Sequence, residues 1–123
     1  MTNTNSPKEV FDNFVKQMNE AYNEQTYLIE LYNNSVNPDT PELEYFDCNK
    51  AIKFTRTWEL IQQLKPQQRN LLICRMAFTT IAECLRVFNG VNNTKTNDTT
   101  FRVLVYNAKN ELKRLYAQRY DNL

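Results

Sequence analysis

The chain has 123 residues, of which 41% are hydrophobic and 24% charged, and its net charge is +1; this composition is typical of one globular domain spanning residues 1–123. It has no histidine and a single glycine, Gly90, which excludes Ser-His-Asp and Cys-His catalysis and glycine-rich phosphate loops. No apolar run approaches the roughly 18 residues that cross a bilayer, and the polar N-terminus lacks a secretion signal. We therefore expect a soluble, cytoplasmic protein without a membrane partner.

The first predicted helix covers about residues 7–33. Ser6 and Glu9 form a capping box, with Pro7 at the first helical position. Apolar residues then recur at steps of three and four, which places them on one helical stripe. The amide-rich stretch 33–38, which ends in proline, predicts a turn.

A second predicted helix covers residues 41–64, with an interruption left open at residues 47–49. Its apolar residues keep the helical spacing as far as Pro66. Because proline disfavours helical geometry in the residue before it but suits the first turn of a helix, Pro66 separates this helix from the next.

The third predicted helix covers residues 66–89. We predict one unbroken helix because its apolar residues follow heptad steps: Leu71, Cys74, Phe78, Ile81, Leu85 and Phe88. Asn89-Gly90 then predicts a left-handed C-terminal cap at the glycine.

Residues 90–100 are predicted to form a polar loop, and the last predicted helix covers residues 99–121, capped by Asn97, Asp98 or Thr99. Four amphipathic helices with short or moderate connections predict an all-α domain, a four-helix antiparallel bundle.

Charge is distributed unevenly along the chain. Residues 1–49 carry two bases and nine acids, a net charge of −7, whereas residues 50–123 carry thirteen bases and five acids, a net charge of +8. Two interpretations are open: the basic half forms an outward docking face, or the two halves neutralise each other within the fold.

The last helix carries the candidate site. Basic and aromatic residues share one stripe beside its apolar face, with two further arginines nearby: Arg102, Tyr106, Lys109, Lys113, Tyr116 and Tyr120, then Arg114 and Arg119. Cations suit phosphates and rings suit bases, so the stripe predicts a macromolecule-binding surface. The alternative is that the tyrosine rings are buried at a core boundary while the basic side chains extend around them.

No catalytic, cofactor-binding or metal-binding residue is predicted. Glu20 and Glu24 lie one helical turn apart, but a di-iron bundle needs histidine partners. The odd number of cysteines predicts reduced thiols. Cys74 and Cys84 fit an apolar seam, with activation by a neighbouring arginine as the alternative.

Residues 64–72, Leu-Lys-Pro-Gln-Gln-Arg-Asn-Leu-Leu, precede Thr-Ile-Ala-Glu at 80–83. This order resembles the promoter-reading helix-turn-helix of bacterial sigma factors, in which a Leu-Pro-x-x-x-Arg opening precedes an Ile-Ala-Glu helix. The resemblance implies that the last helix reads DNA with Thr100, Arg102 and Lys109.

The sequence also departs from that family. Fewer residues separate Arg75 from Ile81 than the family's turn requires, no glycine lies between them, and the loop 90–100 is longer. The heptad spacing favours one helix where the family has two.

Aromatic and branched residues off the main stripes are candidate anchors for a partner protein: Trp58, Tyr45, Tyr27 and Val103. The first functional expectation is a non-enzymatic helical binding protein, a viral or mobile-element regulator or inhibitor with a protein partner. The second is a DNA- or RNA-binding transcriptional regulator that uses the last helix. The third is a structural subunit that forms homo-oligomers.

Overall fold

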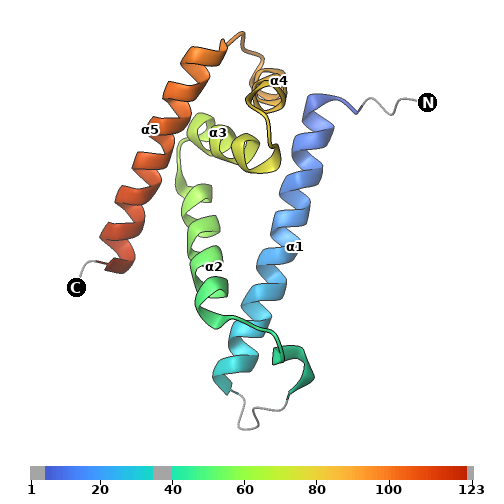
Figure 1. The fold of residues 1–123 in the computed structure, drawn as a ribbon, viewed down its shortest axis with the longest axis vertical. Coiled ribbons are helices and arrows are strands. Elements are labelled where there is room, and N and C mark those ends of the chain that lie inside the picture. The colour runs from blue at the N-terminus through green and yellow to red at the C-terminus, as the bar shows by residue number, and fades with distance from the viewer. Residues whose placement is uncertain (1–4, 35–39, 122–123) are drawn as a thin grey trace.

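Figure 1 shows the computed structural model, which describes residues 5–34 and 40–121. Its elements are α1 (Pro7–Asn34), a 3-10 turn η1 (Pro41–Leu43), α2 (Cys48–Gln63), α3 (Pro66–Ala77), α4 (Ile81–Asn92), α5 (Asp98–Tyr116) and a π-helical turn η2 (Ala117–Asp121). These residues contain no strand. The predicted all-α class is confirmed.

Three helices run along the long axis of the molecule in Figure 1: α1, α2 and α5, with α2 between the other two. Helix α3 crosses the end of this layer and packs against α5 and α4, while α4 also packs against α1. The predicted four-helix antiparallel bundle is not confirmed, because five α-helices lie within the described residues and α3 is not aligned with the long helices.

Several predicted helix ends are confirmed by their capping bonds. The Ser6 hydroxyl accepts the Glu9 backbone N–H at 3.2 Å, and the Asn97 side chain accepts the Thr100 N–H at 2.8 Å. Each bond satisfies a backbone donor that the first turn of a helix leaves unpaired. Residues 33 and 34 of the predicted turn at 33–38 belong to the last turn of α1. The rest of that predicted turn lies outside the described residues.

The second predicted helix, 41–64, is wrong at its beginning. Residues Pro41–Leu43 form a single 3-10 turn in place of the predicted α-helix, and α2 begins at Cys48. The Asp47 carboxylate accepts the Lys50 N–H at 3.1 Å and caps α2. This cap stops the helix from extending backward, at the interruption that the sequence left open.

The third predicted helix, 66–89, is also wrong, because the chain leaves helical geometry at residues 78–80. The Thr80 hydroxyl accepts the Glu83 N–H at 3.3 Å and caps α4, while Arg75 donates to the Phe78 carbonyl at 3.1 Å. Both bonds satisfy backbone groups that a continuous helix would have paired internally. The segment consists of two helices, α3 and α4, joined by the non-helical residues 78–80.

Gly90 is not the predicted left-handed cap. It lies inside α4 without a positive φ, and the left-handed residue is Asn93, with φ of 54° at the C-cap. The glycine instead permits a close approach, since a Cβ atom at position 90 would lie 2.3 Å from the Cβ of Pro7. The first turn of α1 therefore packs directly on the α4 backbone.

We expect Gly90→Ala to lower the free energy of unfolding. Alanine is the better helix former by about 1 kcal/mol, but overpacking costs about 1–3 kcal/mol, and the Pro7 ring must move. Urea denaturation of the variant measures the net loss, with Asn110→Ala at an exposed position of α5 as the control. A gain in stability for Gly90→Ala would contradict the close approach.

The core lies at the α3–α4–α5 end of the molecule. These three helices contribute most of its buried side chains, including Leu71, Ile73, Cys74, Cys84, Val87, Phe88, Phe101, Val105 and Ala108. Helix α1 contributes only Phe11 as a buried residue. None of the described residues from 12 to 50 is buried, and three tyrosines in this range, Tyr27, Tyr32 and Tyr45, are exposed.

Candidate functional site on helix α5

Six of the eight predicted site residues lie on exposed positions of α5 and η2: Arg102, Tyr106, Lys109, Lys113, Arg114 and Arg119. The apolar side of the helix, with Phe101, Val105 and Ala108, is buried against the core. Tyr106 is 65% exposed and Val103 is 54% exposed. The outer face of α5 is therefore a continuous polar and basic surface with aromatic and branched side chains in it.

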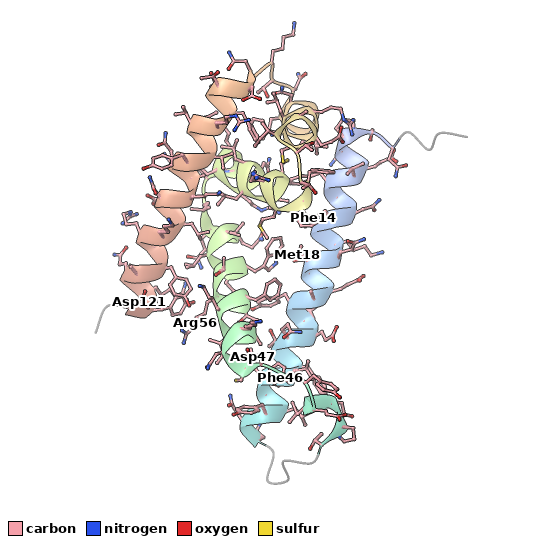
Figure 2. The ribbon with its side chains drawn as sticks, in the orientation of Figure 1. Phe14, Met18, Phe46, Asp47, Arg56 and Asp121 are labelled. Carbon is pink, nitrogen blue, oxygen red and sulfur yellow. The ribbon has the colours of Figure 1, made fainter. Side chains whose placement is uncertain are left out.

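The two remaining site residues, Tyr116 and Tyr120, are only half-exposed. Their rings lie 5.0 Å apart, and the Arg56 guanidinium of α2 lies 4.4 Å from the centre of the Tyr120 ring. Figure 2 shows Arg56 on the side of α2 that faces the C-terminal end of α5, near Asp121. Tyr120 of η2 therefore contacts α2 and Tyr116 packs beside it, so neither tyrosine belongs to the exposed part of the predicted stripe.

Two arginines of the outer face are paired with acids on the same helix. The Arg102 Nε lies 2.5 Å from Asp98, and Arg114 Nη2 lies 2.6 Å from Glu111. The hydrogen bond from Arg114 lowers the pKa of the Glu111 carboxyl. Exposed pairs of this kind contribute little to stability, so a phosphate can replace the carboxylate at little cost.

A hollow of about 210 Å³ brings α5 together with α3. It is lined by Arg75, Ile81, Arg102, Val105, Tyr106 and Lys109, with no acidic side chain in the lining. Arg75 was absent from the predicted site because it lies far from α5 in the sequence, and no sequence pattern links it to Arg102. Three cations and a tyrosine therefore surround one small depression.

An apolar hollow of about 440 Å³ shares Arg75 and Lys109 with the first. Its lining is completed by Thr57, Ile61, Leu72, Met76 and Leu112 from α2, α3 and α5. Met76 is 46% exposed. The basic surface of α5 thus borders an apolar depression on the α2 side.

The charge split is not neutralised by ion pairs between the two halves of the chain. Among the described residues all four ion pairs join side chains three or four positions apart on one helix. Helices α1 and α5 lie on opposite sides of α2 (Figure 1). The bases of α5 are therefore not paired with the acids of α1, whereas basic α2 packs directly against α1.

The cysteine thiols lie apart from this surface. Cys74 and Cys84 are buried, and Cys48 is partly exposed. Burial raises the pKa of the Cys74 thiol to about 12, which opposes the thiolate form that a nucleophile requires. Among the described residues no three Cys, Asp or Glu side chains form a group that could hold a metal ion.

We expect only Cys48 to react rapidly with Ellman's reagent in the native protein at about pH 8. The raised pKa keeps Cys74 protonated at this pH, and the Cys84 side chain is fully covered. All three thiols should react after unfolding in urea, which supplies the control. Rapid reaction of two or more thiols in the native state would show that the α3–α4 core opens readily.

No family model, curated protein or solved structure matches this chain. In the part of the chain that the structure describes, no helix combines the length and hydropathy needed to span a bilayer.

One of the departures from the sigma-factor pattern was the single helix predicted over residues 66–89. That departure is removed, because α3 and α4 are separate helices. The three DNA-reading residues that the resemblance implies, Thr100, Arg102 and Lys109, all lie at exposed positions of α5.

Proposed function

We propose that this chain is a non-enzymatic regulator that binds duplex DNA through the outer face of α5. One observation carries the proposal: Arg75 of α3 joins Arg102 and Lys109 of α5 around a hollow without acidic side chains. Converging cations of this kind suit a phosphate group, and guanidinium groups bind its oxygens in a bidentate manner. Further along α5, Lys113 and Arg114 extend the basic surface.

The arrangement of α5 favours a duplex over other polyanions. It is a 19-residue helix at the edge of the molecule, with one face packed and the other exposed. The major groove of B-DNA is about 12 Å wide and admits such a helix, whereas the major groove of A-form RNA is too narrow. At the N-terminal turns of α5, Thr99, Arg102 and Tyr106 are exposed and within reach of base edges in this proposal.

The test is a titration of a labelled DNA duplex of about three helical turns at about 50 and 200 mM salt. If four to six side chains contact phosphates, the affinity should fall by about 10²- to 10³-fold between these conditions. A duplex RNA of equal length should bind more weakly. No binding at the lower salt concentration would refute the proposal.

The other expectations stay predictions. A protein partner, the first expectation from the sequence, is favoured by a different part of the surface, where acidic and aromatic side chains gather. Self-assembly, the absence of enzyme activity and a single domain over residues 1–123 stay predictions as well.

A further inference from the structure

The end of the molecule opposite the core differs from α5 in charge. The described residues 17–34 and 40–49, named here the acidic end, contain no lysine or arginine. They carry six acids: Glu20, Glu24, Glu30, Glu42, Glu44 and Asp47. None of the six takes part in an ion pair within the described residues, and the one cation beside them in the hollow at this end is Lys50.

The acidic end also contains a hollow with a volume of about 610 Å³. Helix α1 supplies one wall and η1 with the beginning of α2 supplies the other. The apolar part of the lining consists of Ala21, Leu28, Pro41, Tyr45, Phe46, Ala51 and Phe54, and the polar part of Gln25, Glu42, Asp47 and Lys50. It is an apolar depression with two acids and one base among its lining residues.

Two contacts hold the walls of this hollow in place. The rings of Tyr32 and Phe46 lie 6.0 Å apart and join the end of α1 to the segment before α2. The Asp47 cap fixes the first turn of α2. Figure 2 shows Phe46 and Asp47 where this segment meets α2, beside the C-terminal half of α1. Tyr45, by contrast, is 92% exposed.

We propose that this hollow is the docking site for a basic amphipathic segment of another protein. Leucine-sized anchors of such a segment fit an apolar depression between two helical walls, which is the usual geometry of helix-in-groove recognition. Lysine and arginine on its flanks would face the six acids, none of which has an ion-pair partner within the described residues. Exposed tyrosines are typical of the residues that dominate the energy of protein interfaces.

The charge of the acidic end disfavours polyanionic partners at this surface. Nucleic acids and anionic membranes carry the same sign of charge and are repelled. The site is therefore independent of the proposed DNA-binding face, which lies across α2 from α1. One molecule would hold DNA at one side and a basic protein segment at the other.

The test uses a labelled helical peptide of about 14 residues with leucine on one face and lysine on the other. Two peptides serve as controls: one with glutamate in place of lysine, and one with the same residues in a scrambled, non-amphipathic order. The full chain should bind the first peptide in a fluorescence anisotropy titration and bind neither control measurably. Equal binding of the scrambled peptide would reduce the interaction to general charge attraction and overturn the proposal.

Two matched variants separate this site from the α5 face. Tyr45→Ala should weaken peptide binding about tenfold and leave DNA binding unchanged, whereas Tyr106→Ala should leave peptide binding unchanged. Glu42→Lys with Glu44→Lys should lower the affinity for the peptide at least as much as Tyr45→Ala does. Circular dichroism verifies that each variant is folded.

Unchanged peptide affinity in Tyr45→Ala would refute the proposal, whether or not the chain binds DNA. Concentration-dependent dimers that Tyr45→Ala abolishes would also overturn it, since the occupant would then be a second copy.

Discussion

Phe88→Ala is expected to destabilise this protein more than any other single truncation of a side chain. Phe88 is fully covered, and its ring meets the ring of Phe101 edge to face at 5.7 Å, so that α4 is joined to α5 through this pair. Truncation of a buried phenylalanine costs about 3–5 kcal/mol. A chain of this length has a stability of roughly 6–18 kcal/mol, so the loss is a large share of the total.

Urea denaturation followed by circular dichroism measures this loss, and thermal denaturation should show a midpoint about 10–20 °C lower. Tyr45→Ala is the matched control, because it also removes an aromatic ring, but one that is almost fully exposed; its effect should stay within about 0.5 kcal/mol. A double-mutant cycle with Phe101→Ala isolates the ring pair, which we expect to contribute about 0.5–1.5 kcal/mol. A loss of less than about 2 kcal/mol for Phe88→Ala would be inconsistent with a tightly packed core here.

Lys109→Glu with Lys113→Glu is expected to have the largest effect on DNA binding. Both lysines are exposed on α5, and neither belongs to an ion pair within the described residues. The double replacement removes two phosphate contacts and adds two repulsions. We expect at least about a 10²-fold loss of affinity at 50 mM salt and a salt slope lower by about 2.

Lys8→Glu with Lys16→Glu makes the same change of net charge on α1, away from α5, and is the control for that experiment. It should retain most of the affinity for DNA. Equal losses in the two double variants would mean that net charge alone governs binding, and that the face of α5 has no special part in it.

The helix ends that the sequence predicted correctly depend on neighbouring residues. Ser6 with Glu9, Pro66, and Asn97 with Thr100 each act within one turn, so their patterns are visible in the sequence. The break at 78–80 was missed because its apolar residues keep heptad steps across a turn that is not helical. Thr80 and Glu83 match the capping-box pattern Thr-x-x-Glu, which predicts a helix beginning after Thr80. The heptad spacing across residues 71–88 predicts the opposite, a continuous helix.

The candidate surfaces were predictable only in part. The exposure of Lys109 and Lys113 follows from the helical period, because the apolar side of α5 had to be buried. That Arg75 lies beside them depends on how α3 crosses α5, which no local pattern specifies. Among the four candidate anchors, Trp58 is buried and donates to Asn19 at 3.0 Å, whereas Tyr45 is exposed. The sequence spacing could not distinguish the two environments.

The restriction of the ion pairs to single helices has a consequence for motion in solution. Because no ion pair among the described residues joins two helices, the acids of the acidic end and the bases of α5 stay separated, which gives an electric dipole directed from the acidic end toward α5. The field of a polyanion exerts a torque on such a dipole before the surfaces touch, and this torque orients α5 toward the polyanion. Above about 0.15 M salt, counterions confine that field to about 8 Å, and collisions become randomly oriented.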